Sequence, residues 1–285
     1  MNTYNLSSDK IPPHITIITR AIKDILGEQA YDFMLIGATA RDIIMDGIYD
    51  LGVSRMTADV DFAVFVPEWD NYARLMNKLI TSGSFTATQT THKLIFNNTY
   101  EIDIVPFGDI QNEEGQYTWP PDNIKAMNVA GFTEVSESGL RIVTEETDFR
   151  IASVPGICIM KILAWKDRGY RDNRDGKDLG FILFNYIELK YEDLYALHED
   201  LMVAPDFDRI VTTARIMGRD IGKLLKTNSI ALNQIYDILH AATLDEEYSR
   251  LALAIKEGGT MSYKIAYKSL LAVMDGISDS NTLWA

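Results

Sequence analysis

The sequence predicts an α+β protein, in which a mixed β-sheet with flanking helices is followed by an α-helical bundle. Short runs of β-branched and aromatic residues recur as far as Val143, which is typical of strands. After Pro155, apolar residues recur at three-to-four spacing, which is typical of amphipathic helices. Because the pattern changes between residues 144 and 153, two domains are expected, residues 1–150 and residues 151–285.

In the first domain the expected strands are Phe33–Gly37, Val60–Val66, Lys93–Phe96, Tyr100–Phe107 and, more weakly, Leu140–Val143. Two segments between them have the apolar spacing of helices that cover a sheet, Thr39–Tyr49 and Trp69–Ile80. Asn97 and Asn98 tolerate positive φ, so a tight hairpin is expected there, with its two strands antiparallel. The stretch 109–139 contains several Gly and Pro residues and is expected to be irregular.

In the second domain helices are expected over Pro155–Asp167, Lys177–Tyr186, Tyr191–Asp200, Asp206–Leu225, Ala231–Ala242, Asp245–Lys256 and Ser262–Met274. No strand-like alternation interrupts this pattern, so the segment is expected to be helical throughout.

Composition excludes several classes of protein. With 285 residues, 47% of them apolar, the chain can bury a substantial core. The single cysteine, Cys158, excludes an internal disulfide and a Cys-x-x-Cys pair, and the four histidines lack metal-ligand spacing. The sequence shows neither a basic-then-apolar leader nor an apolar run of about 18 residues, so a cytoplasmic protein without membrane contact is expected.

The charge of the chain is unevenly distributed. A net charge of −14 opposes nonspecific attraction to nucleic acid or anionic membrane, although a local basic cleft could still bind nucleic acid. Residues 1–150 carry 11 Lys or Arg against 22 Asp or Glu, and the remainder carries 16 against 19. The acidic first half is explained either by a solubilising surface or by carboxylates gathered around a divalent metal.

Two aspartates stand at alternate positions of one expected strand. Asp59 and Asp61 would point to the same face, about 7 Å apart, while Val60 and Phe62 point into the core. A hard divalent cation would turn the repulsion of the two carboxylates into coordination. A solvated pair at a sheet edge is the alternative interpretation.

A third aspartate lies in the strand-like run Glu101–Phe107. Asp103 is a carboxylate between Ile102 and Ile104, which favour burial. If this strand pairs with the one that carries Asp61, the carboxylates converge as a two-metal phosphoryl-transfer site requires. Taken alone, Asp103 also fits a surface residue.

A glycine turn joins an apolar strand to a helix at Gly37, Ala38 and Thr39. Such a turn exposes backbone N–H groups, and the Thr39 hydroxyl is a further donor, so the turn suits a phosphate. A routine strand-to-helix turn is the alternative.

A cationic stretch begins the second domain. Between Lys161 and Lys177, six Lys or Arg residues stand against three Asp residues. Cations of this kind either face an anionic ligand such as a triphosphate or extend to solvent from a helix end.

The order of these motifs resembles the nucleotidyltransferase superfamily typified by DNA polymerase beta. More narrowly, Gly37-Ala38-Thr39-Ala40 followed by Arg55-x-Thr57-x-Asp59-x-Asp61 is similar to AbiEii-type nucleotidyltransferases, a group that includes toxins of type IV toxin–antitoxin systems. Lys161 to Arg168 and Lys177-Asp178-Leu179 look like the Lys-bearing helix and the downstream Lys-Asp pair of that family. The resemblance covers about Phe33 to Tyr186, and Ala38 departs from the more frequent second glycine or serine.

The resemblance implies a nucleotidyltransferase domain that binds a nucleoside triphosphate and Mg²⁺ or Mn²⁺. The implied metal ligands are Asp59, Asp61 and Asp103. The implied triphosphate contacts are Gly37, Ala38, Thr39, Arg41 and Lys161. Asp178 would accept a proton, pair with Lys161 or support the site. The acceptor hydroxyl would belong to an RNA end, a protein or a small molecule, and a partner antitoxin is implied by kinship.

Three other classes share parts of this pattern. Glycosyltransferases hold Mn²⁺ with an Asp-x-Asp, but a βαβ nucleotide-binding unit would be expected before it. In haloacid-dehalogenase-like phosphatases the motif normally continues into Gly and Thr or Val, whereas Phe62 and Ala63 follow here. A degenerate nucleotidyltransferase domain that binds a nucleotide or a protein without catalysis is the third alternative.

Overall fold

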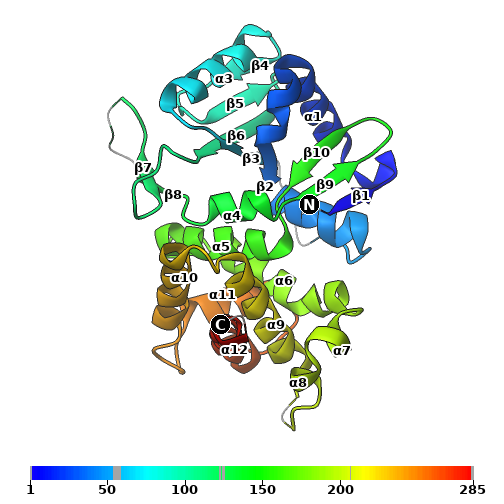
Figure 1. Cartoon of the computed structure of the whole chain (residues 1–285), viewed down its shortest axis with the longest axis vertical. Coiled ribbons are helices and arrows are strands. Elements are labelled where there is room, and N and C mark those ends of the chain that lie inside the picture. Colours follow the sequence, from blue (N-terminus) through cyan, green and yellow to red (C-terminus); the bar gives the residue numbers. More distant parts are fainter. Residues whose placement is uncertain (1, 54–58, 122, 124–125, 206, 284–285) are drawn as a thin grey trace. The chain divides into compact units, whose positions relative to one another are not determined.

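The structure is a computed structural model that describes residues 2–53, 59–121, 123, 126–205 and 207–283, without the side chains of residues 31 and 281–283. The chain divides into two compact units, Met1–Ser153 and Val154–Ala285, whose elements are labelled in Figure 1. The expected domain boundary was between residues 150 and 151. Arg55 and Thr57 of the family-like motif lie outside the described residues.

The first unit contains an eight-stranded mixed sheet in the order β1-β9-β10-β2-β3-β6-β5-β4. Its strands are β1 (Thr3–Asn5), β2 (Phe33–Ile36), β3 (Val60–Phe65), β4 (Phe85–Ala87), β5 (Lys93–Phe96), β6 (Tyr100–Phe107), β9 (Leu140–Val143) and β10 (Asp148–Ile151). The central strand β3 is antiparallel to β2 and parallel to β6. A separate two-stranded ribbon is formed by β7 (Gln116–Thr118) and β8 (Ala126–Asn128).

Helices cover both faces of this sheet. On one face, α1 (Pro13–Leu26) and α3 (Trp69–Thr81) pack against each other, as Figure 1 shows, and Ile22 of α1 lies near Phe62. Tyr72 of α3 donates a 2.9 Å hydrogen bond to the carbonyl oxygen of Ile104. On the other face, α4 (Phe132–Glu137) brings Phe132 against Phe107, with ring centroids 6.0 Å apart.

The strands expected from the sequence are confirmed, and their ends differ by a residue at most. The expected helix 39–49 begins earlier, as α2 (Gly37–Asp42), and continues as the π-helical segment η3 (Ile43–Ile48). The stretch 109–139 is less irregular than expected, because it contains β7, β8 and α4. The short strands β1, β4 and β10 and the helix α1 were not expected from the sequence.

Aromatic side chains explain why the stretch 109–139 forms regular secondary structure. Trp69 and Tyr72 of α3 meet Tyr117 and Trp119, with ring centroids 5.2 to 6.0 Å apart. His92 stacks on Trp119 at 4.8 Å. Burying rings of this size is strongly favourable, so the cluster anchors the β7–β8 ribbon to α3.

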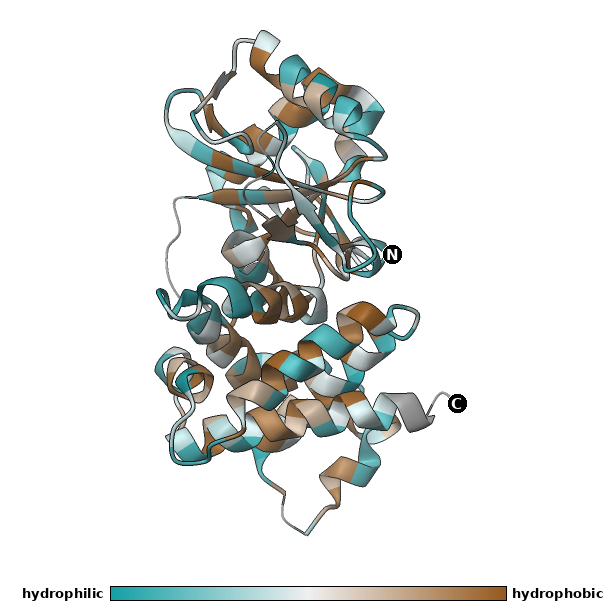
Figure 2. Ribbon diagram, turned by 90° about the vertical axis from the view of Figure 1, so that its left-hand side faces the viewer, coloured by the Kyte–Doolittle hydropathy of each residue, from teal (hydrophilic) through white to brown (hydrophobic). Residues whose placement is uncertain are grey.

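The described residues of the second unit form helices and no strand. The helices are α5 (Val154–Arg168), α6 (Arg174–Lys190), α7 (Leu194–Leu197), α8 (Glu199–Met202), α9 (Arg209–Leu224), α10 (Ser229–Ala242), α11 (Arg250–Gly258) and α12 (Tyr263–Leu283). Figure 2 shows hydrophilic and hydrophobic residues interspersed along these helices, as expected for amphipathic helices, which have apolar residues at three-to-four spacing. The expected helix 191–200 is broken into α7 and α8.

The helices α9 and α12 approach each other closely. A Cβ on Gly218 would overlap the carbonyl oxygen of Val273, and one on Gly276 would overlap that of Arg215. Asp279 of α12 accepts 2.8 Å hydrogen bonds from both Arg215 and Arg219 of α9. Small residues and ion pairs therefore fix this helix pair together.

Candidate active site

A row of four residues crosses the middle of the sheet in the first unit. Lys93 of β5 pairs in register with Asp103 of β6, and Asp103 pairs with Asp61 of β3. Asp61 in turn pairs with Ile36, the last residue of β2. Residues in register on neighbouring strands are about 4.8 Å apart and share a face, so Asp61 and Asp103 stand side by side. The structure thus meets the condition, pairing of the two strands, under which the sequence analysis expected these two carboxylates to converge.

Gly37 lies at the β2 end of this row, because it directly follows Ile36. It has a φ of +73°, a backbone conformation that L side chains rarely adopt. A Cβ on Gly37 would overlap Oδ2 of Asp61, so the chain turns against the carboxylate at the one residue type that leaves room for it. The glycine turn and the aspartate pair are therefore neighbours and form one candidate site.

The residues that follow Gly37 are buried. Ala38 is 5% exposed and Thr39 is 7% exposed, and the Thr39 hydroxyl lies 3.5 Å from the carbonyl oxygen of Asp59. Arg41 is fully buried, and its guanidinium donates two hydrogen bonds, of 2.8 and 2.6 Å, to the carboxylate of Asp42. Arg41 therefore pairs with Asp42 of its own helix and does not reach the surface of the turn, where a triphosphate contact was expected.

Asp59 precedes β3 and is exposed, whereas Asp61 and Asp103 are half-buried. In the described part of the chain, no three His, Cys, Asp or Glu side chains are grouped so that they could hold a metal ion. Mg²⁺, however, is commonly held by one or two carboxylates together with water and substrate phosphates. The Asp61 and Asp103 carboxylates, side by side on one face of the sheet, fit a cation of that kind.

Lys93 was not predicted as a site residue. Its ammonium lies 3.0 Å from Oδ1 of Asp103 and 2.8 Å from Oε2 of Glu101. Burial lowers the pKa of Lys93, but the two carboxylates outweigh it, so the pKa lies above its usual value. The signal that could have found Lys93 is the register of the β5–β6 hairpin, which puts residue 93 opposite residue 103.

In the second unit, Lys161 and Asp178 form a buried ion pair. The Lys161 ammonium lies 2.6 Å from Asp178 and 3.1 Å from Asp175, and all three residues are at most 7% exposed. Arg168 adds two hydrogen bonds to Asp175, of 2.6 and 2.8 Å. Burial raises the pKa of Asp175, but the cations outweigh it and hold the pKa below its usual value.

This buried cluster joins α5 to α6. Of the roles expected for Asp178, the structure shows the pairing with Lys161. Lys161 contacts two acids of its own unit, and the cationic stretch around it is partly neutralised by such internal pairs. The structure thereby shows Lys161 as the shared cation of two buried acids in the second unit.

Lys161→Met is expected to lower the free energy of unfolding by about 3 to 5 kcal/mol, because it leaves buried Asp175 and Asp178 without their shared cation. The matched control is Lys177→Met, since Lys177 pairs with Glu257 at 3.1 Å on the surface and should contribute at most about 1 kcal/mol. Urea unfolding of the two variants measures the difference. Equal midpoints would contradict the buried role of Lys161.

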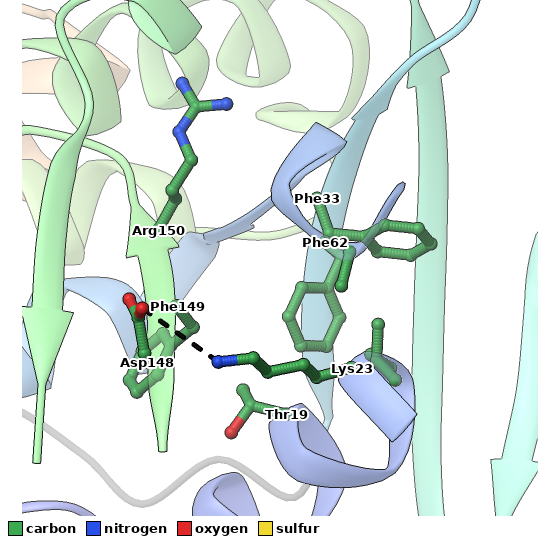
Figure 3. A pocket seen from close by; sticks show the side chains of 9 residues that line it. Thr19, Lys23, Phe33, Phe62, Asp148, Phe149 and Arg150 are labelled. Carbon is green, nitrogen blue, oxygen red and sulfur yellow. Dashed lines mark ion pairs between the residues drawn. The ribbon is translucent and has the colours of Figure 1, made fainter. Parts of the chain in front are cut away.

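Other hollows lie away from these residues. In the first unit, a pocket of about 20 Å³ lies near Phe33, Phe62 and the Lys23–Asp148 pair (Figure 3), and it is large enough for water alone. Phe62 points away from the face that carries Asp61, so this pocket is separate from the aspartate pair. In the second unit, a groove of about 470 Å³ is lined by residues that include Trp165, Tyr170, Ala241, Tyr248 and Arg250.

Comparisons of the chain with protein-family models, with curated proteins and with solved structures find no match. Among the described helices, none is long and apolar enough to cross a membrane.

Proposed function

We propose that this protein is a metal-dependent nucleotidyltransferase with a nucleotidyltransferase-type sheet. It would transfer a nucleoside monophosphate from a nucleoside triphosphate to an acceptor hydroxyl. The observation that carries the proposal is the row in which Gly37, Asp61 and Asp103 meet. The order of these residues along the chain is also the order that resembles this superfamily.

Asp61 and Asp103 would hold the Mg²⁺ or Mn²⁺ ions, with Asp59, which precedes β3, as the additional ligand. Bound divalent cations would neutralise charge on the phosphates and lower the pKa of the acceptor hydroxyl. The acceptor oxygen forms a bond to the α-phosphorus, the bond from that phosphorus to the bridging oxygen breaks, and pyrophosphate leaves with the electron pair. The hydroxyl proton passes to solvent.

The contribution of this chain is mainly to position charge. The β3–β6 pairing holds the two carboxylates side by side on one face of the sheet, so two anionic oxygen ligands are in position before a cation arrives. The turn at Gly37 lets the backbone lie against Asp61 without a side chain between them. A triphosphate would supply further oxygen ligands to a cation held by these carboxylates, which favours binding of both together.

The acceptor is an RNA end, a protein or a small molecule, and labelling identifies it. The purified protein is incubated with each α-³²P-labelled triphosphate, Mg²⁺ and total cell extract, and the label is followed into RNA, protein and metabolite fractions. The proposal expects label in one fraction, dependent on Mg²⁺ and absent with Asp61→Asn. Equal labelling by the parent and by this variant would refute the proposal.

A toxin role is a further part of this proposal and rests on the family resemblance alone. Expression of the parent chain would then arrest growth, and Asp61→Asn would not. A neighbouring reading frame that relieves the arrest would supply the antitoxin.

Nucleotide binding without transfer is the second candidate. Two observations favour it. Asp61 and Asp103 lie side by side, whereas Asp59 is exposed. Among the described residues, no third His, Cys, Asp or Glu joins such a pair to form a group that could hold a metal ion. Binding alone would raise the unfolding temperature when Mg²⁺ and a triphosphate are added, with no labelled product in any fraction. A labelled product would exclude this candidate.

A further inference from the structure

Lys93 lies at the end of the carboxylate row, opposite the end where Gly37 lies. The antiparallel pairing of β5 and β6 holds Lys93 beside Asp103, and Asp103 lies beside Asp61. The side chains of Lys93 and Asp103 are 24% and 23% exposed, so solvent screens this pair less than a surface pair. The row therefore contains its own cation, 3.0 Å from the carboxylate proposed to bind metal.

A divalent cation on Asp103 would share that carboxylate with the Lys93 ammonium. Two cations on one carboxylate repel each other, and near a protein surface such a repulsion changes an affinity by at least about tenfold. Glu101, whose Oε2 lies 2.8 Å from the same ammonium, gives Lys93 a second anchor. Lys93 thus stays near Asp103 rather than leaving the row freely.

We infer that Lys93 is a positioning residue that sets the metal affinity of the site by competing for Asp103. In the absence of nucleotide it balances the row and keeps the affinity for a free divalent cation low. A triphosphate brings several negative charges of its own and shifts the balance towards the metal. The cation therefore binds mainly together with the nucleotide. This inference rests on the proposed function.

Binding of Mn²⁺ alone, followed by electron paramagnetic resonance of the free ion, tests the inference on the full chain. Lys93→Met is expected to bind Mn²⁺ at least about tenfold more tightly than the parent. Lys93→Arg keeps the positive charge and is expected to restore the parent affinity. The matched control is Lys78→Met, because Lys78 is an exposed lysine of the same unit that bonds to Gln29 at 2.8 Å, and its loss should leave the affinity unchanged.

A non-hydrolysable triphosphate provides the second measurement. It is expected to tighten Mn²⁺ binding strongly in the parent and much less in Lys93→Met, because the variant already binds the free ion. If Lys93→Met does not fold, as judged by circular dichroism, Lys93→Gln carries the same expectation.

The failure of this inference differs from the failure of the proposed function. If the parent binds Mn²⁺ with the triphosphate and Lys93→Met binds the free ion no more tightly than the parent, the role of Lys93 is refuted and the metal site stands. If the parent binds no Mn²⁺ even with the triphosphate, the proposed metal site is refuted, and the role of Lys93 with it.

Discussion

Asp61→Asn is expected to reduce nucleotide transfer by about a thousandfold or more, which corresponds to about 4 kcal/mol of transition-state stabilisation. Asp61 is the central member of the row, in register with Asp103 on one side and adjacent to Gly37 on the other. Asparagine keeps the shape of the side chain but cannot supply the second anionic oxygen. The rate of labelled product formation at saturating triphosphate measures the effect.

The same substitution should leave the fold intact. Asparagine has nearly the size and shape of aspartate, so the circular dichroism spectrum of the variant should match that of the parent. Asp109→Asn is the matched control, because Asp109 is an exposed acid that follows β6 in the same unit. A variant at position 61 that transfers nucleotide at the rate of this control would contradict the assignment of Asp61.

Gly37→Ala is expected to reduce transfer by about a hundredfold, because the new Cβ would displace the carboxylate of Asp61, and misplacement of a reacting group by about 1 Å has an effect of that size. It should also lower the free energy of unfolding by about 1 to 2 kcal/mol, since its φ of +73° is unfavourable for alanine. Steady-state rates and urea unfolding measure the two effects.

Gly83→Ala separates these two effects. Gly83 has a φ of +80°, and a Cβ there would meet no atom within 4 Å. It should therefore lose a similar amount of stability and retain transfer. If both alanine variants retained the parent rate, the close approach of Gly37 to Asp61 would have no part in the chemistry.

The central part of the sheet could be predicted because its strands carry their signal locally. Alternation within residues 60–66 and 100–107 fixes which side chains face the core, and it places Asp61 and Asp103 on the less apolar positions. The pairing of β3 with β6 is a long-range contact that alternation does not encode. From the sequence, the convergence of Asp61 and Asp103 could therefore be expected only on the condition that these two strands pair.

The loop between β5 and β6 sets the register that places Lys93 opposite Asp103. A tight turn at Asn97 and Asn98 was expected, and both residues do have positive φ, of 47° and 55°. The structure pairs Phe96 with Tyr100, so Thr99 belongs to the loop, in agreement with the expected strands Lys93–Phe96 and Tyr100–Phe107. This one residue decides the face of Lys93, because a slip of one position would turn its side chain away from Asp103.

The pairing of Lys161 with Asp178 was one of three roles expected for Asp178, but the choice among them and the second partner, Asp175, could not be read from the sequence. The helix of Lys161 was predicted, but Lys161 has Asp175 and Asp178 as partners on the next helix, and the crossing of two helices depends on the packing of the whole unit. The sequence showed a cationic stretch, and the structure shows that its buried lysine is neutralised internally. The helix α1 was missed although Ile15, Ile18 and Ile22 recur at helical spacing and are buried.

The central claim is that Asp61 and Asp103 bind one divalent cation in common. It is tested most directly by a crystal structure of the protein with Mn²⁺ and a non-hydrolysable triphosphate, with the anomalous signal of manganese recorded. The account predicts an anomalous peak at coordination distance, about 2.0 to 2.2 Å, from an oxygen of each carboxylate. An ordered triphosphate with no manganese beside these two residues would contradict it.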